Sequence, residues 1–315
     1  MRRSEAKPSR AAVEAPALRV LVAGAGGMLG QDLVAASARR GHEVLGLARA
    51  ELDITDARAV EDLITDARPD AIVNCAAWTD VDGAEANERE AMRVNDTAAA
   101  LLATAAAAHD ASVLFVSSDY VFDGEKGAPY VESDLTGAIS AYGRTKQAGE
   151  TSVAIANPRH FIVRSSWLFG VGGGNFVETM LRVGGEQSEV IVVSDQVGTP
   201  TYTPHLAAGL AELIEGEDYG IHHMPASGSC SWFEYAQEIF DQEALECRVM
   251  AGTTEMLARP APRPRYSVLG SERPDRIELP HWRRGLAEYL GERAGVGRGT
   301  ADRGTPGRGA EEVPR

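Results

Sequence analysis

A tyrosine and a lysine stand four residues apart in the segment YGRTK (142–146). Residues at this spacing share one face of a helix, so the phenol of Tyr142 and the ammonium of Lys146 are predicted to be neighbours. A tyrosine that donates a proton near neutral pH needs its pKa lowered from ~10 toward ~7, which is about 4 kcal/mol of preference for the phenolate. A nearby ammonium acts in that direction. The pair therefore predicts a proton-transfer site, although a plain surface pair would give the same spacing.

A hydroxyl group is expected beside this pair. The apolar run 112–117 ends in the segment SSDYVFDG (117–124). Ligands of an open parallel sheet bind beyond the carboxyl ends of its strands, so Ser118 is expected to face the same cleft and to hydrogen-bond a substrate carbonyl. No G-x-S-x-G turn surrounds it, which argues against a serine nucleophile. Serine, tyrosine and lysine together indicate a site for hydride transfer.

A glycine-rich turn follows the first apolar run, 18–23, and precedes a helix that is expected to reach Arg40. It reads GAGGMLG (24–30), so that Gly24, Gly27 and Gly30 follow a G-x-x-G-x-x-G pattern. Such a turn lets the backbone approach a pyrophosphate, which then meets the free N–H groups at the helix N-terminus. The pattern predicts a dinucleotide site, and an ordinary glycine turn is the alternative.

The end of the second apolar run bears on which dinucleotide binds. An acidic residue there would bind the ribose hydroxyls and repel a 2′-phosphate. This run ends in LAR (47–49), and the first acid is Glu51. Arg49 therefore favours NADPH and leaves NADH open, while a plain surface charge would look the same.

Apolar runs alternate with helical stretches along the first half of the chain, which is typical of a parallel sheet covered on both faces. Strands are expected at 18–23, 43–48, 71–75, 112–117 and 160–165, and helices up to 40 and at 58–67, 88–108 and 141–156. The prediction is an α/β fold with a Rossmann-type doubly wound parallel sheet.

The second half is expected to form a smaller α/β substrate-binding domain. It contains a loop at 170–175, strands at 189–193 and 220–224, a helix at 204–215, and a helix opened by a capping box of Ser231 and Glu234. The expected division is a disordered tail (1–17), an NAD(P)-binding domain (18–168), a substrate-binding region with segments that return to the first domain (169–293), and a second disordered tail (294–315).

Composition excludes several classes of protein. The net charge of −15 argues against a broad nucleic-acid interface, which would need basic residues to neutralise phosphates. No apolar run approaches the ~18 residues of a membrane span, and the N-terminus does not resemble a secretory signal. Three scattered cysteines do not form a disulfide framework or a zinc motif. A cytoplasmic enzyme is expected.

Longer motifs carry a resemblance to a known family. The chain resembles, from about 18 to 293, the extended short-chain dehydrogenase/reductase superfamily and within it the dTDP-4-dehydrorhamnose reductase family. The segments that carry this resemblance are NCAAWTDVD (74–82), VN (94–95), SSDYVFDG (117–124), YGRTK (142–146), RSSW (164–167), DQVGTPT (195–201) and RPRYSVL (263–269).

The resemblance implies a reduction by NAD(P)H of the C4 ketone of dTDP-4-dehydro-L-rhamnose. It implies that Tyr142 donates the proton, that Lys146 tunes it and holds the nicotinamide ribose, that Ser118 binds the keto oxygen, and that Asn95 supports a proton relay. The implied cofactor contacts are Gly24, Gly27, Met28, Leu29, Gly30, Arg49, Asp53, Ile54, Ala76, Ala77, Trp78, Tyr142 and Lys146. The implied substrate contacts are Ser118, Asp119, Tyr142 and Trp167, with core packing as the alternative for Trp167.

Some members of this family are associated with Mg²⁺ at a dimer interface, so a homodimer and Mg²⁺ stay open on resemblance alone. The sequence has no acidic cluster that demands the ion. Two other functions also stay open. Another nucleotide-sugar 4-ketoreductase or an epimerase would keep the same residues, and the regulatory subunit of methionine adenosyltransferase shares this fold as a non-catalytic binding module.

Overall fold

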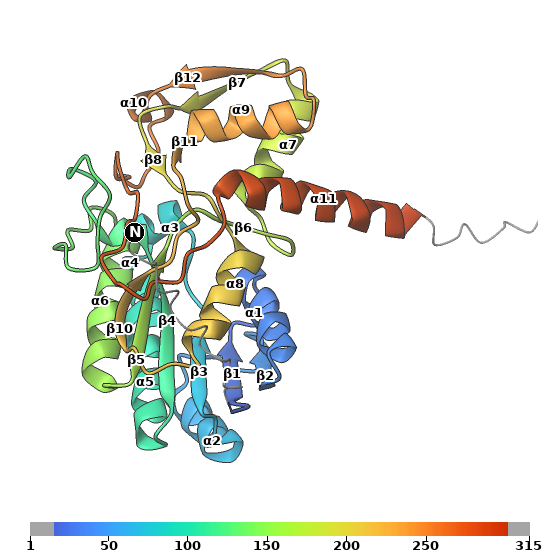
Figure 1. Ribbon diagram of the computed structural model, residues 1–315. Helices are drawn as coiled ribbons and strands as arrows, with labels where there is room; N and C mark the ends of the chain where they lie inside the picture. The colour runs from blue at the N-terminus through green and yellow to red at the C-terminus, as the bar shows by residue number, and fades with distance from the viewer. Residues whose placement is uncertain (1–15, 302–315) are drawn as a thin grey trace, which may run out of the picture.

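The computed structural model describes residues 16–301, and its centre is a six-stranded sheet (Figure 1). The strands are β1 (Arg19–Ala23), β2 (Glu43–Leu47), β3 (Ala71–Asn74), β4 (Ser112–Ser118), β5 (His160–Ser165) and β10 (Gly220–His223). Their order is β10-β5-β4-β3-β1-β2, and every pairing is parallel. Ala23 pairs with Leu47 on one side and with Asn74 on the other, so these strands end level. The winding reverses between β1 and β3, which is where such sheets bind ligands.

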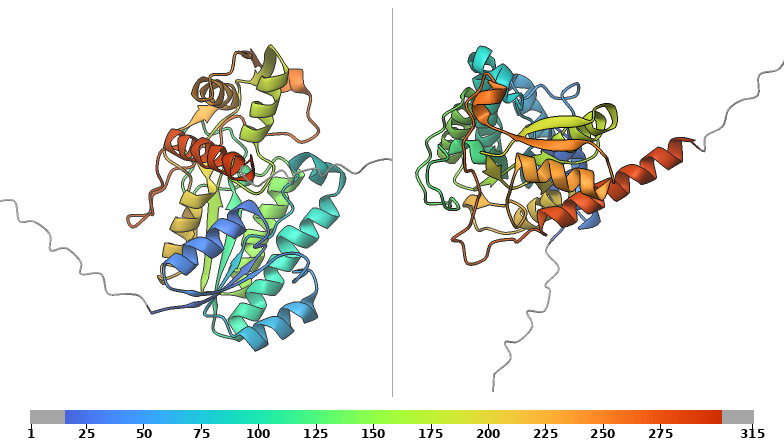
Figure 2. Two further views of the ribbon diagram at one scale, coloured as in Figure 1. Left: turned by 90° about the vertical axis from the view of Figure 1, so that its right-hand side faces the viewer. Right: turned by 90° about the horizontal axis from the view of Figure 1, so that it is seen from above.

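Helices cover both faces of this sheet, as the alternation of apolar runs and helices predicts (Figure 2). The helices are α1 (Met28–Arg39) and α8 (Thr203–Leu213) on one face, and α2 (Ala57–Ala67), α5 (Ala98–Ala108) and α6 (Ala141–Ala156) on the other. Val20 and Val22 face the first group, whereas Leu21 between them faces the second. Both faces of the strands are therefore buried, and the Rossmann-like fold is confirmed.

The helix expected as one piece at 88–108 has an irregular centre. It consists of α4 (Glu88–Met92), a π-helical stretch η1 (Arg93–Thr97) and α5. Helix α6 crosses η1 closely, since a Cβ at Gly149 would lie 2.2 Å from the carbonyl oxygen of Asn95. Single π turns inside helices occur often at functional sites. Here the turn contains Asn95, one of the predicted site residues.

A second, smaller layer lies at one end of the sheet (Figure 1). Its elements are α7 (Phe176–Glu186), β7 (Glu189–Val193), α9 (Trp232–Gln242), β12 (Arg248–Gly252), α10 (Thr254–Leu257) and α11 (Trp282–Ala301). Short elements are α3 (Val81–Ala86), η2 (Asp119–Val121), β6 (Leu168–Phe169), β8 (Val197–Gly198), β9 (Thr201–Tyr202) and β11 (Cys230–Ser231). Buried aromatic side chains form the core of this layer, among them Phe169, Tyr235, Trp282 and Tyr289. The capping box of Ser231 is present at the start of α9.

The second half of the chain contributes to both layers. Strand β10 pairs with β5, and α8 packs against α1, so both belong to the first layer.

Helix α11 continues to Ala301, past the boundary at 294 where a tail is expected. Most of the two expected tails, 1–17 and 294–315, lies outside the described residues. Within residues 16–301, no helix is both long and apolar enough to cross a bilayer.

Candidate active site

A cleft of about 1290 Å³ lies between the carboxyl end of the sheet and the smaller layer. It brings together predicted residues that are more than 140 positions apart in the sequence. Those that line it are Gly24, Gly27, Met28, Leu29, Gly30, Arg49, Asp53, Ile54, Ala76, Ala77, Trp78, Ser118, Asp119, Tyr142, Lys146 and Trp167. Asn95 is the one predicted site residue that does not line it.

The glycine turn forms one wall of the cleft. Gly24 has a φ of +82°, and a Cβ there would lie 2.6 Å from the backbone nitrogen of Ala76. A Cβ at Gly30 would lie 2.2 Å from the carbonyl oxygen of Gly24. Gly27 caps α1 without a side chain, so the first N–H groups of the helix are not covered by one. This arrangement fits a diphosphate, because free N–H groups at a helix N-terminus attract anions.

Two arginines line the part of the cleft beyond β2. Arg49, predicted from the sequence, is joined there by Arg93 from η1, which the sequence did not single out. The Nη1 of Arg93 donates to Thr55 Oγ1 at 2.9 Å, and Thr55 in turn donates to Asp53 Oδ1 at 2.8 Å. Hydrogen bonds from Thr55 and the charges of both arginines lower the pKa of Asp53. A 2′-phosphate would therefore meet cations here, which fits NADPH.

Tyr142 and Lys146 lie in the first two turns of α6, and both line the cleft. Lys146 is buried, with its Nζ 4.2 Å from the centre of the Phe115 ring. Burial lowers the pKa of Lys146 to about 7, against the opposing effect of the Glu150 carboxylate. Burial also raises the pKa of Tyr142 to about 12, while a hydrogen bond with Ser118 lowers it. The expected lowering of the Tyr142 pKa by the ammonium is thus not found in the free protein, because burial dominates at both groups.

Ser118 and Asp119 end β4 beside Tyr142. Ser118 Oγ donates to Asp119 Oδ1 at 3.0 Å and accepts from the backbone N–H of Tyr120 at 3.2 Å. The other carboxylate oxygen, Asp119 Oδ2, accepts from Ser267 Oγ at 2.5 Å. Burial raises the pKa of Asp119 to about 7. Ser267 belongs to the RPRYSVL segment, but nothing in its spacing predicts this contact across 148 residues.

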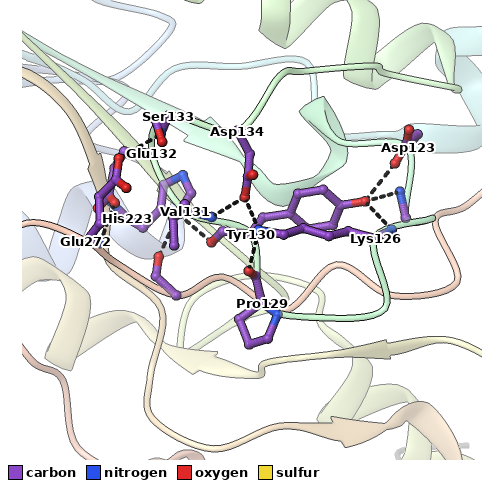
Figure 3. A network of polar contacts seen from close by, with 12 residues as sticks. Asp123, Lys126, Pro129, Tyr130, Val131, Glu132, Ser133, Asp134, His223 and Glu272 are labelled. Atoms are coloured by element: carbon purple, nitrogen blue, oxygen red, sulfur yellow. Dashed lines mark hydrogen bonds and ion pairs between the residues drawn. The ribbon is translucent and has the colours of Figure 1, made fainter.

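The loop that follows these residues is fastened to the sheet (Figure 3). Tyr130 Oη donates to Asp123 Oδ1 at 2.6 Å, and Lys126 forms an ion pair with Asp134. The imidazole of His223, at the end of β10, lies 3.1 Å from the carbonyl oxygen of Tyr130. The first two contacts hold the loop together, and the contact with His223 joins it to β10 at the edge of the sheet.

Asn95 lies behind the cleft and is fully buried. Its side chain accepts from the backbone N–H of Trp78 at 2.9 Å, and it donates to the carbonyl oxygen of Trp78 at 3.1 Å and to Thr145 Oγ1 at 2.9 Å. Thr145 Oγ1 donates to the carbonyl oxygen of Tyr142 at 2.7 Å. Asn95 therefore ties the segment that follows β3 to the helix that carries Tyr142, and its place in a proton relay stays a prediction.

An aromatic wall faces the cleft from the smaller layer. The rings of Trp167 and Trp232 stack with centres 3.5 Å apart and planes 7° apart, and Phe176 packs on Trp232. Trp167 has a φ of +49°, which is unusual for a large side chain. A Cβ at Gly198 would lie 2.5 Å from its indole, so the DQVGTPT motif leaves room for this ring. Trp167 both packs and lines the cleft, and its buried Nε1 lacks an acceptor among the described residues.

Two more arginines line the cleft from the segment before Ser267. The guanidinium Nη2 of Arg259 lies 2.6 Å from Asp82 Oδ2, and Nη1 of Arg263 lies 3.0 Å from Asp82 Oδ1. Despite burial, these hydrogen bonds lower the pKa of Asp82 to about 2. Although the chain carries a net charge of −15, this wall of the cleft presents cations. Among residues 16–301, no group of three or more His, Cys, Asp or Glu side chains could hold a metal ion, so Mg²⁺ gains no support.

Comparisons with known proteins agree with one another. The family model described as "RmlD substrate binding domain" matches residues 18–294. A dTDP-4-dehydrorhamnose reductase from Streptomyces griseus is 44% identical over 283 residues, 87% of this chain and 93% of that protein. A dTDP-4-keto-6-deoxy-D-glucose reductase from Streptomyces niveus is 41% identical over 256 residues, 81% of this chain and 89% of that protein. The crystal structure of dTDP-4-dehydrorhamnose reductase from Bacillus anthracis in complex with NADP has a TM-score of 0.85 and 36% identity, covering 88% of this chain and all of that one.

Proposed function

This chain belongs to the dTDP-4-dehydrorhamnose reductase family, and we propose that it reduces the C4 ketone of dTDP-4-dehydro-L-rhamnose with NADPH to give dTDP-L-rhamnose. The observation that carries the proposal is the cleft, where the glycine turn and the Ser118, Tyr142 and Lys146 side chains meet in one cavity. NADPH is favoured over NADH by Arg49 and Arg93, and a relative of the same family binds NADP.

The side chains at the end of β4 and the start of α6 handle the proton. Bound NADPH supplies a hydride to the ketone carbon. Tyr142 holds a proton on Oη at neutral pH, since its pKa lies near 12, and gives it to the sugar oxygen as negative charge develops there. Ser118 stabilises the same oxygen by a hydrogen bond. Lys146, when charged, stabilises the phenolate that Tyr142 becomes after it has given up its proton.

The two layers bind different parts of the reacting pair, the dinucleotide and the sugar nucleotide. In this proposal, the turn with Gly24, Gly27, Met28, Leu29 and Gly30 would hold the diphosphate of the dinucleotide, Asp53 and Ile54 its adenine end, and Ala76, Ala77 and Trp78 the part between, because all of them line the cleft. We assign this binding role to the first layer and substrate binding to the second. Trp167 contacts the sugar nucleotide, and the cations Arg259 and Arg263 favour its diphosphate, whereas Asp119 lies behind Ser118 at the end of β4. A homodimer and a cytoplasmic location stay predictions.

A second candidate is a 4-ketoreductase that acts on another dTDP-4-keto-6-deoxy sugar. The 41% identity with the Streptomyces niveus reductase supports it, because the same proton donor and cofactor site serve either sugar. Incubation of the purified chain with NADPH and each dTDP-4-keto sugar, with the product identified by NMR, distinguishes the two. An absence of NADPH oxidation with every sugar would count against both and favour a non-catalytic binding role.

The role of Tyr142 is tested by single-turnover oxidation of NADPH. The cleft offers a matched control in Tyr120, whose ring centre lies 6.0 Å from that of Tyr142. Tyr142→Phe is expected to slow the step by about 10²–10⁴-fold, the usual contribution of a general acid. Tyr120→Phe should slow it far less, because Tyr120 has no lysine one helical turn away. Similar rates for the two variants would refute the assignment of the proton donor.

A further inference from the structure

The hydroxyl of Ser118 has only one hydrogen, and a carboxylate oxygen lies within hydrogen-bonding distance of it. Ser118 Oγ donates it to Asp119 Oδ1 at 3.0 Å and accepts from the backbone N–H of Tyr120 at 3.2 Å. As long as Asp119 is an anion, it accepts this hydrogen. The hydrogen is then not available to a ketone in the cleft, although stabilising the sugar oxygen requires it.

The surroundings of Asp119 favour its neutral form. The side chain is 2% exposed, and no ion-pair partner for it is present in the described part of the chain. Oδ2 is held by the hydroxyl of Ser267, which leaves Oδ1 as the oxygen that faces Ser118. The titratable groups nearby are the phenols of Tyr120 on its own segment and Tyr142 on α6, and the guanidinium of Arg263 faces Tyr120. Hydrogen bonds from Ser118, from Ser267 and from the backbone of Asp119 and Tyr120 favour the anion, but the effect of burial outweighs them.

We propose that Asp119 acts as a neutral acid whose proton lies on Oδ1 and is donated to Ser118 Oγ, so that the hydrogen of Ser118 turns to the carbonyl oxygen of the sugar. This inference rests on the proposed function. No bond to carbon is made or broken by Asp119, and Tyr142 still supplies the proton that the product keeps. Asp119 is a positioning residue, because it acts through Ser118. Two donors then point at one oxygen before charge develops on it.

Burial raises the pKa of Asp119 to about 7, so the neutral form is accessible in the working range of pH. It follows that activity should fall as Asp119 loses its proton. Lys146 also has a pKa near 7, so a fall in wild-type activity above neutral pH would not by itself identify the group. A comparison of the pH dependence of Asp119→Asn with that of the wild type removes this ambiguity, because both enzymes contain Lys146.

The test is the ratio of kcat/KM between Asp119→Asn and the wild type, measured with saturating NADPH from pH 6 to pH 8.5. The asparagine amide can donate to Ser118 and accept from Ser267 at every pH, as the neutral acid does. With a midpoint near 7, the neutral fraction of Asp119 falls about 30-fold over this range. The ratio is therefore expected to rise about 30-fold. A ratio that does not change with pH would overturn the proposal.

Two controls sharpen the result. In a Ser118→Ala background, Asp119→Asn should change kcat/KM by the same factor at every pH, since the hydroxyl it acts through is gone. A persistent rise there would mean that Asp119 acts directly on the substrate and would overturn the positioning role.

Asp123→Asn makes the same chemical change four residues away and outside the cleft lining. It should leave the ratio flat, because the pKa of Asp123 is lowered by its hydrogen bond with Tyr130.

A readout without turnover separates this inference from the proposed function. The carboxyl carbons of ¹³C-labelled aspartate are titrated by NMR in the wild type, and Asp119→Asn identifies the resonance of Asp119. A midpoint near 7 supports the neutral acid, whereas a midpoint below about 4, the ordinary range, overturns it. If the wild type oxidises no NADPH with any dTDP-4-keto sugar, the proposed function fails while this titration still decides the state of Asp119.

Discussion

A buried ion pair beneath the active site gives the largest single stability prediction. Glu150 lies one helical turn after Lys146 on α6, and both of its carboxylate oxygens accept from Arg164 of β5, at 2.8 and 2.6 Å. Ser117 donates to the same carboxylate at 2.5 Å. The side chains of Arg164 and Glu150 are 3% and 7% exposed. The perturbation is Glu150→Leu, which leaves the guanidinium buried without its partner.

The magnitude follows from this burial. Removing one partner of a buried pair leaves an unpaired charge and reduces the free energy of unfolding by about 3–5 kcal/mol. Replacing both partners by apolar residues removes the unpaired charge, so Glu150→Leu combined with Arg164→Met should recover about 2 kcal/mol or more of that loss. A control pair lies on the surface, where Arg182 and Glu186 are about 60% exposed. Glu186→Gln should change stability by about 0.5 kcal/mol or less.

The assay is urea unfolding at pH 7, followed by tryptophan fluorescence and by far-ultraviolet circular dichroism. Coincident transitions from the two probes allow the free energies to be compared. A loss below about 1 kcal/mol for Glu150→Leu would refute the reasoning, because the pair would then behave as a surface contact. A double variant less stable than the single one would also refute it, since the loss would come from packing and not from the buried charge.

Two further predictions concern the cofactor. Gly30→Ala places a Cβ 2.2 Å from the carbonyl oxygen of Gly24, so the turn must shift, and the Kd for NADPH measured by fluorescence titration should rise at least about tenfold. Gly185→Ala, in a helix with no atom within 4 Å of the new Cβ, should leave that Kd unchanged, and equal effects of the two variants would contradict the argument. Arg49→Ala together with Arg93→Ala should lower the preference for NADPH over NADH in kcat/KM by about tenfold or more, as expected for lost phosphate contacts. An unchanged preference would show that the 2′-phosphate is bound elsewhere.

Local patterns predicted the elements that carry the chemistry. The helix at 141–156 and the strand at 160–165 have the predicted bounds, because their signals lie within single segments. The glycine turn was also predictable, since Gly24 and Gly30 are required by close contacts within a few residues and with the adjacent strand. Strand–turn–helix order then placed Ser118 and Tyr142 at the same end of the sheet.

Contacts between distant segments were not predictable in this way. Ser267 reaches Asp119 across 148 residues, and Trp232 stacks on Trp167 from another element. Arg93 enters the cofactor end of the cleft from a π-helical stretch that the apolar pattern of a plain helix conceals. These placements depend on how the two layers pack, and no spacing within one segment encodes that.

The pKa values of the central pair also depend on packing, and their direction is informative. A spacing of four residues correctly placed Tyr142 and Lys146 in one cleft, but burial sets the Tyr142 pKa near 12 and the Lys146 pKa near 7 in the free protein. A pKa near 12 keeps the phenol of Tyr142 protonated in the free protein, but the transfer of that proton to the sugar oxygen still needs a nearby positive charge that lowers the pKa. An anionic dinucleotide in the cleft would favour the charged form of Lys146, since a nearby negative charge raises the pKa of an ammonium. Binding of the cofactor therefore increases the charged fraction of Lys146, and this charge stabilises the phenolate of Tyr142. In the free protein, the proton stays on the phenol of Tyr142.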